Sequence, residues 1–225
     1  VRMPSDSVAA NLITAAGVPI AAPSANLSGR PSPTSARHVM DDLDGRIDAI
    51  LEGDECRVGI ESTVVDMTGN VPVVLRPGII TPEQLSRVLG KTVELDPVLR
   101  TRPEIKRGQE LLETTENFKP KSPGMKYKHY APKAEMVIYK GDRDKVLLAI
   151  TEEKFRRTEC GQKVEIIMFD DDEPEIAARE FFAKLRACDK AEVDVILAAA
   201  LKEDGVGFSV MNRMFKSAGY NIVEV

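Results

Sequence analysis

The chain is poor in the residues that build disulfide frameworks and metal sites. It has no tryptophan, three cysteines and two histidines in 225 residues. The cysteines stand far apart without a CxxC pair, so the sequence predicts neither a disulfide framework nor a zinc site. Scattered thiols of this kind are typical of a reducing compartment. We therefore expect a cytoplasmic protein whose own side chains hold no metal.

Long apolar runs are also missing. No stretch approaches the ~20 apolar residues that a membrane-spanning helix needs, so we expect no membrane association. The first residues do not have the pattern of a signal peptide. A net charge of −5 argues against nonspecific binding of nucleic acid but leaves a local basic patch open. The sequence has no GxxxxGK[ST] motif, which excludes a conventional phosphate loop.

Periodicity in the first hundred residues predicts a mixture of helices and strands. Helical spacing predicts three helices, at residues 7–16, 35–43 and 81–89. Short apolar runs predict four strands, at residues 18–22, 49–51, 62–67 and 71–75. Thr68-Gly69-Asn70 joins the last two strands as in a hairpin. A loop rich in turn formers and hydroxyls follows the first strand at residues 23–34.

The second half has a different organisation. Residues 99–133 are rich in proline and in cations and lack periodicity, which is typical of a linker. From residue 134 onward, strand and helix patterns alternate, and this predicts a parallel sheet covered by helices. The fold class is therefore α/β: a partial twisted open sheet at 1–98, a linker at 99–133 and a small doubly wound, Rossmann-like domain at 134–225.

The loop at residues 23–34 is the first candidate for a ligand site. Ligands of open α/β sheets gather at the carboxyl ends of strands, and the loop follows a predicted strand. Its hydroxyls, its amide and successive backbone N–H groups can cradle a phosphate without a basic side chain. A plain connecting loop has the same composition, so the residues alone leave both interpretations open.

Two arginines and a serine are further candidates. Arg76 ends a predicted strand, where its forked donors can reach a phosphate or a carboxylate, and Arg2 has the same capacity. For both arginines the alternative is a surface salt bridge. Ser62 begins a strand and can hydrogen-bond a polar substrate, although an ordinary strand entry has the same pattern.

An unusual aromatic segment lies within the predicted linker. In Lys126-Tyr127-Lys128-His129-Tyr130, cations and aromatic rings alternate. Such rings anchor a linker to a domain surface, or cover a ligand that binds beneath it. The two roles are compatible, because a linker anchored over a pocket is a lid.

Five segments, taken in order, resemble the signatures of a known family. They are VRMP, AAPSANLSGRPSPT, GIESTVVD, LRPG and SPGMKYKHYAP, and GFSVMNR near the C-terminus adds a sixth similarity. Together they resemble the threonylcarbamoyl-adenylate synthases in their long, two-domain form with a YrdC-like fold. The resemblance implies a nucleotidyltransferase that makes L-threonylcarbamoyladenylate from L-threonine, bicarbonate and ATP. That product serves threonylcarbamoyladenosine modification of tRNA.

The resemblance also implies roles for individual residues. The residues that match the family's ATP contacts are Ser24, Ser32, Arg76 and Tyr130, with Asn26 assisting. Those that match its L-threonine contacts are Arg2, Ala22 and Ser62. Mg²⁺ is implied as an ion bound through ATP, and no catalytic nucleophile or base can be named. tRNA and tRNA-modification proteins are implied only as indirect partners.

This sequence departs from the family pattern at its N-terminus. The chain starts at Val1 without a methionine, and the N-terminal portion of the family's catalytic domain has no counterpart. That portion carries a lysine and an arginine that face the ATP phosphates. We interpret the chain as one whose N-terminal part is missing, and expect it to be inactive alone. The alternative function is a non-catalytic nucleotide- or RNA-binding module.

Overall fold

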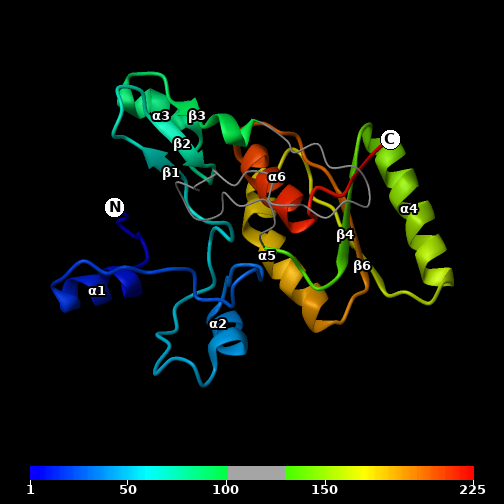
Figure 1. Cartoon of the computed structure of the whole chain (residues 1–225), viewed down its shortest axis with the longest axis horizontal. Helices are drawn as coiled ribbons and strands as arrows, with labels where there is room; N and C mark the ends of the chain where they lie inside the picture. Colours follow the sequence, from blue (N-terminus) through cyan, green and yellow to red (C-terminus); the bar gives the residue numbers. More distant parts are fainter. Residues whose placement is uncertain (101–129) are drawn as a thin grey trace, which may run out of the picture.

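The computed structural model describes residues 1–100 and 130–225. Two sheets organise these residues, a small mixed sheet in the N-terminal region (residues 1–100) and a larger parallel sheet in the C-terminal unit (residues 134–225) (Figure 1). Most of the predicted linker and residues 126–129 of its aromatic segment lie outside the described residues.

The C-terminal unit has the predicted alternation of strands and helices. Its elements are β4 Glu135–Lys140, α4 Arg143–Glu159, β5 Val164–Ile167, α5 Pro174–Lys190, β6 Val195–Ala199, α6 Gly205–Ser217 and β7 Ile222–Glu224. The strands run parallel in the order β5-β6-β4-β7. The predicted parallel sheet is confirmed, whereas β7 was not predicted because it is only three residues long.

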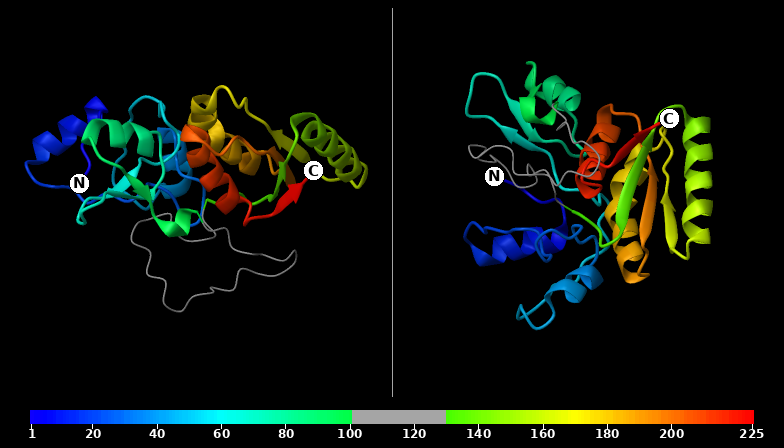
Figure 2. Two further views of the ribbon diagram at one scale, coloured as in Figure 1. Left: turned by 90° about the horizontal axis from the view of Figure 1, so that it is seen from above. Right: turned by 45° about the vertical axis from the view of Figure 1, so that its right-hand side comes forward.

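Helices cover both faces of this sheet. Along β4, Met136 and Ile138 pack in one apolar cluster with α5 and α6. The intervening Val137 and Tyr139 pack in a second cluster with α4. This alternation follows from the two-residue period of a strand, which sends successive side chains to opposite faces. Figure 2 shows α4 on one side of the sheet and α5 with α6 on the other, which confirms the doubly wound arrangement.

The three predicted helices of the N-terminal region are present as α1 Ser7–Ala16, α2 Ala36–Leu43 and α3 Pro82–Leu89. A polar side chain caps the start of each helix: Asp6 accepts from the Ala9 amide, Ser35 from His38 and Thr81 from Gln84. The Gln84 side chain also accepts from the Thr81 amide at 2.8 Å, which completes a capping box.

The small sheet contains the predicted hairpin. β1 Val64–Asp66 pairs antiparallel with β2 Val73–Arg76, and β3 Glu94–Leu95 pairs parallel with β2. A 3₁₀ helix, η1 Pro97–Leu99, follows β3. The sequence did not predict β3 or η1, and β3 forms through its pairing with β2 rather than from a pattern of its own.

Two predicted strands are wrong. Residues 18–22 and 49–51 are not strands, and the first of these segments is exposed, with Val18 at 61% and Ile20 at 46% of full accessibility. An apolar run becomes a strand only when a neighbouring strand accepts its backbone hydrogen bonds. Within residues 1–100 and 130–225, no strand pairs with either segment. The predicted loop at 23–34 is present, but the buried strand that was expected to precede it is not.

Candidate functional site

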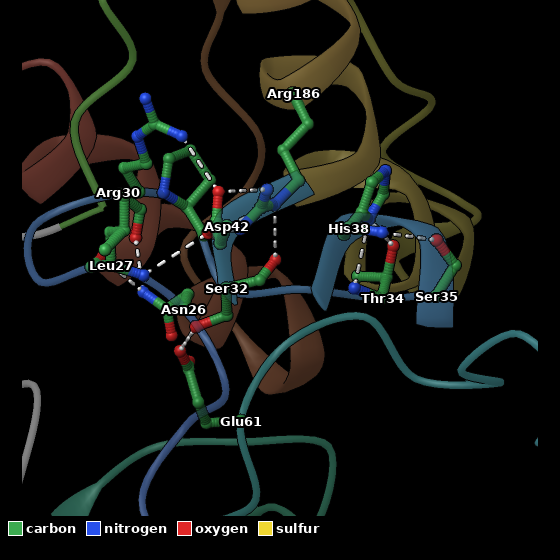
Figure 3. Close-up of polar contacts among 11 residues, drawn as sticks. Asn26, Leu27, Arg30, Ser32, Thr34, Ser35, His38, Asp42, Glu61 and Arg186 are labelled. Carbon is green, nitrogen blue, oxygen red and sulfur yellow. Dashed lines mark hydrogen bonds and ion pairs between the residues drawn. The ribbon is translucent and has the colours of Figure 1, made fainter. Parts of the chain in front are cut away.

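Several of the predicted site residues lie around a partly buried carboxylate, Glu61. The Ser32 hydroxyl donates to Glu61 Oε1 at 2.6 Å, as Figure 3 shows. From the C-terminal unit, Arg213 Nε donates to Glu61 Oε2 at 3.2 Å. Because Ser32 gives its only proton to Glu61, its oxygen can meet a ligand only through lone pairs. Ser32 is therefore suited to a ligand hydroxyl or amine rather than to a phosphate oxygen.

Arg76 stands at the end of β2 and is only 6% exposed. Its Nε and Nη2 atoms donate to the Ser62 carbonyl oxygen at 3.1 and 3.0 Å. Burial lowers the pKa of Arg76, while nearby Glu61 acts in the opposite direction. The Arg76 side chain is thus buried rather than at the surface. It holds the backbone of Ser62, whose own side chain is exposed.

Tyr130 lies just after the undescribed segment and is anchored to the C-terminal unit. It is 3% exposed, and its ring centroid is 5.0 Å from that of Phe182 on α5. Burial, followed by Glu61, raises the pKa of its hydroxyl to about 12. A hydrogen bond to Glu61 contributes to that shift. The ring therefore acts as an anchor in this structure, and its hydroxyl points to the same carboxylate as Ser32.

The cluster has more positive than negative charge. Arg76, Arg213 and Lys216 are all buried close to Glu61. Burial, followed by the charge of Arg213, lowers the pKa of Lys216 to about 7. Arg2 is exposed, yet it is close enough to contribute to the lowered pKa of Arg76. Such an excess of positive charge favours an anionic ligand.

The candidate loop at 23–34 is folded around Asn26. The Asn26 amide nitrogen donates to the carbonyls of Leu27 at 2.9 Å and Arg30 at 3.2 Å. Its Oδ1 is buried and has no hydrogen-bond partner among the described residues. Asn26 thus closes the loop with its donors and leaves an acceptor unused.

Another carboxylate, that of Asp42 on α2, is buried and holds the same loop. It accepts from the Leu27 amide at 3.3 Å and forms ion pairs with Arg30 at 2.8 Å and Arg186 at 2.7 Å (Figure 3). These hydrogen bonds and charges outweigh the opposing effect of burial and lower the pKa of Asp42. The loop is therefore fixed to both α2 and α5.

The structure gathers some of the predicted residues and not others. Ser32, Ser62, Arg76 and Tyr130 lie around Glu61, and the exposed Arg2 lies near Arg76. Ala22 and Ser24 are exposed, and among the described residues no hydrogen bond links them to this cluster. Both follow the segment that was wrongly predicted as a buried strand.

The sequence analysis did not single out Glu61, Asp42, Arg186 and Arg213. Glu61 lies inside the GIESTVVD motif and Arg213 inside GFSVMNR, so the motifs were the only available signal. The partners of each ion pair are 152 and 144 positions apart. No local pattern connects residues at such distances.

Other candidates do not form a site in the described residues. His38 bonds Thr34 within its own turn, and burial followed by the charge of Arg186 lowers its pKa. Within residues 1–100 and 130–225, no three potential metal-ligating side chains come together. The same residues include no helix with both the length and the apolar character needed to cross a bilayer.

Fold and site define an α/β protein with a buried, positively charged cluster between two sheets. Comparison with known families specifies the class. Residues 80–219 match the family described as "Threonylcarbamoyl-AMP synthase, C-terminal domain", and residues 1–78 match the family described as "Telomere recombination". The chain belongs to the threonylcarbamoyl-AMP synthase family, in its two-domain form.

Curated relatives match nearly the whole chain. A threonylcarbamoyl-AMP synthase of Pyrococcus abyssi is 44% identical over 235 residues, which cover 100% of this chain and 65% of the relative. A Bacillus subtilis relative of the same name is 38% identical over 243 residues, covering 99% of this chain and 64% of the relative. The chain thus spans slightly less than two thirds of the length of these relatives.

Solved structures agree with the fold. The crystal structure of Pyrococcus abyssi Sua5 complexed with L-threonine has a TM-score of 0.82 at 44% identity, covering 100% of this chain and 65% of that one. A variant of the same protein, with a histidine and a tyrosine replaced by alanine, has a TM-score of 0.84 at 41% identity, covering 100% and 64%. These similarities confirm the family resemblance and the α/β fold expected from the sequence.

Proposed function

We propose that this chain supplies the larger part of an L-threonylcarbamoyladenylate synthase, a nucleotidyltransferase that uses ATP, L-threonine and bicarbonate. The observation that carries the proposal is the gathering of Ser32, Ser62, Arg76 and Tyr130 around Glu61, with Arg2 near Arg76. These residues come from separate motifs of one family and form a positively charged cluster. The complex of a similar protein with L-threonine supports the choice of substrate.

We assign the ATP side of the site to Ser24, Ser32, Asn26, Arg76 and Tyr130. The buried positive charge of Arg76 suits a triphosphate, since such transfers depend on electrostatic stabilisation. The unused acceptor of Asn26 and the lone pairs of Ser32 suit the hydroxyl and amine donors of a nucleoside.

The L-threonine side comprises Arg2, Ala22 and Ser62. A guanidinium such as that of Arg2 can pair with the substrate carboxylate. The exposed Ser62 hydroxyl stands on a backbone that Arg76 fixes. This arrangement links the two halves of the site. Arg76 fixes the backbone of Ser62 on the threonine side, and its positive charge lies on the ATP side.

A divalent ion is proposed as a companion of ATP rather than as a resident of the protein. The donor set around Glu61 is mainly cationic and hydroxylic, which does not suit a dedicated Mg²⁺ cage of oxygen ligands. Mg²⁺ bound to the phosphates would neutralise part of their charge. The protein then contributes position and positive potential.

The reaction requires placement more than covalent catalysis. The amine nitrogen of L-threonine bonds to the carbon of bicarbonate, and water leaves to give a carbamate. A carbamate oxygen then bonds to the α-phosphorus of ATP, the bond from that phosphorus to the bridging oxygen breaks, and pyrophosphate departs. Holding three reactants in line replaces improbable encounters in solution, and no protein nucleophile is needed.

We further propose a division into a YrdC-like catalytic part at 1–98, a linker and lid at 99–133, and a Rossmann-like domain at 134–225. The different sheets before and after the undescribed segment support this division. The proposed setting is the cytoplasm, with tRNA and its modification proteins acting downstream.

The decisive experiment measures pyrophosphate release from ATP with and without L-threonine and bicarbonate. The full-length gene product is expected to require both, and residues 1–225 by themselves are expected to be inactive. The exposure of Arg2, Ala22 and Ser62 supports the second expectation, because an open threonine side cannot exclude water. ATP binding without any threonine-dependent release by the full-length product would instead favour the non-catalytic nucleotide-binding module.

A further inference from the structure

Helix α5 of the C-terminal unit holds the Ser32 loop through Arg186. Its Nη2 atom donates to the Pro31 carbonyl at 2.7 Å and to Asp42 Oδ2 at 2.7 Å. The Arg186 side chain is 9% exposed and that of Asp42 is fully buried. Figure 3 shows Arg186 reaching from α5 to the loop and to α2. One arginine therefore fixes both the carbonyl before Ser32 and the carboxylate that organises the loop.

Helix α6 holds the second site segment through Arg213, which is completely buried. Besides the Glu61 carboxylate, its guanidinium donates to the Glu61 carbonyl at 3.3 Å and to the Pro77 carbonyl. One turn earlier, the Ser209 hydroxyl donates to the Gly78 carbonyl at 2.8 Å. Both segments of the site, just before Ser62 and just after Arg76, are thus bonded to α6.

The two held segments also contact each other. The 2.6 Å hydrogen bond from Ser32 to Glu61 joins the loop to the segment before Ser62. A continuous series of polar contacts therefore runs from Arg186 through the Ser32 loop and Glu61 to Arg213. Each end of the series belongs to the C-terminal unit.

Close backbone packing restricts the same segments. A Cβ at Gly59 would lie 2.1 Å from the Arg179 carbonyl oxygen on α5, and the Gly59 amide donates to the Ala178 carbonyl at 2.9 Å. A Cβ at Gly78 would lie 2.4 Å from the Thr63 amide nitrogen. Contacts this short leave the backbone little room to shift, so the position of Ser62 depends on α5 and α6.

We propose that Arg186 and Arg213 are positioning residues, through which the C-terminal unit sets the geometry of the substrate site. The inference rests on the proposed function and specifies what the C-terminal unit contributes to it. Neither arginine needs to touch the substrates. Arg213 acts through Glu61 on Ser32 and on the backbone of Ser62, and Arg186 acts on the loop that contains Ser32.

The test compares Arg213→Gln, Arg186→Gln, Arg213→Lys and Ser209→Ala in the full-length gene product. We expect each glutamine variant to raise the KM for ATP or L-threonine at least tenfold, about 1.4 kcal/mol in binding. Arg213→Lys keeps the positive charge but loses the several directed donors of the guanidinium, so its KM is expected to rise less than that of Arg213→Gln. Ser209→Ala removes one hydrogen bond and is expected to cost less than either glutamine variant.

Arg157→Gln is the matched control. Arg157 also bridges two glutamates, Glu153 and Glu135, but on the C-terminal unit and away from the site. The kinetic constants of the Arg157→Gln variant are expected to equal those of the unchanged protein. If the glutamine variants at 186 and 213 only lower the thermal midpoint and leave both KM values unchanged, the positioning role is wrong.

Hydrogen exchange tests the same inference without relying on activity. In Arg213→Gln, the amides of residues 59–63 should exchange at least tenfold faster well below the unfolding temperature, while those of β6 stay protected. Unchanged exchange at 59–63 would overturn the inference even if turnover falls. Failure of the unchanged full-length protein to release pyrophosphate would instead overturn the proposed function, with exchange still deciding the positioning role.

Discussion

The N-terminal region and the C-terminal unit use similar apolar segments with opposite results. Helix α1 has no buried residue, and Leu12 and Val18 are exposed at 48% and 61%. Helix α5, in contrast, buries Phe181, Phe182 and Leu185 completely. Both regions carry the sequence signals of helices. Local sequence signals are therefore sufficient to form a helix. Its apolar side becomes part of a hydrophobic core only when a sheet packs against it.

The boundary between the two regions concentrates the buried charge. Glu61 and Asp42 belong to the N-terminal region, and their partners Arg213 and Arg186 belong to the C-terminal unit. Buried ion pairs are weak contributors to stability when compared with apolar packing, but breaking one is costly. The boundary is therefore a place where geometry is strictly maintained, which suits a binding site.

The largest expected effect comes from expressing the two regions separately. Expressed alone, residues 134–225 should unfold in one cooperative transition, because both faces of their sheet are covered by their own helices. Residues 1–98 alone should show no cooperative transition, because their small sheet has little core of its own. Thermal circular dichroism measures both. A cooperative transition in 1–98, or none in 134–225, would reverse the comparison.

Tyr130 gives the next largest effect, since it links the boundary to the core. Tyr130→Ala removes a buried ring beside Phe182 and should lower the free energy of unfolding by about 3–5 kcal/mol. We also expect ATP affinity or turnover of the full-length product to fall at least tenfold, about 1.4 kcal/mol.

Tyr130→Phe distinguishes the contribution of the ring from that of the hydroxyl. It keeps the ring and loses only the hydroxyl near Glu61, so both losses should be smaller. Tyr139→Phe, which removes a hydroxyl on the α4 face of the sheet, is the control. If folded Tyr130→Ala binds and uses ATP normally, Tyr130 is an anchor and takes no part in the site.

Lys216 tests the electrostatics of the boundary through pH. Its pKa is about 7 in the folded protein against an ordinary value of 10.5. The unfolded chain therefore binds more protons between these values, and stability rises with pH across this window and falls as pH approaches 7. For Lys216 alone, the expected slope between pH 7.5 and 8.5 is about 1 kcal/mol per pH unit.

Replacing the lysine should remove this contribution. Lys216→Met should be more stable than the unchanged protein at pH 7, and the difference should shrink as pH rises. Arg213, Glu61 and Arg76 face the ammonium group. Urea unfolding at several pH values measures the difference, with the exposed Lys154→Met as control. A difference that does not change with pH would contradict the lowered pKa.

The sequence predicted the parts of the molecule that depend on local patterns. The strand and helix alternation of the C-terminal unit, the three helices of the N-terminal region and the hairpin of β1 and β2 all come from neighbouring residues. The unpaired segment at 18–22 was mispredicted because pairing depends on a distant strand. For the same reason, the motifs offered Ser32, Ser62 and Arg76 as candidates, but not the Glu61–Arg213 pair that contacts them.

The prediction with the smallest expected effect tests whether the two regions unfold together. Thr81 caps α3 in the N-terminal region, and Asp142 caps α4 in the C-terminal unit, where it accepts from the Asp144 and Lys145 amides. Loss of either cap should cost about 1 kcal/mol, because helix N–H groups lose their acceptor. If the polar contacts at the boundary make one cooperative unit, Thr81→Ala and Asp142→Ala each lower a single thermal midpoint by about 2–4 °C. If the regions unfold separately, calorimetry shows two transitions, and each variant shifts only the transition of its own region. The double variant Thr81→Ala with Arg213→Gln sharpens the answer, since loss of the boundary contact should confine the cooperative transition to the C-terminal unit, where Thr81→Ala no longer shifts its midpoint.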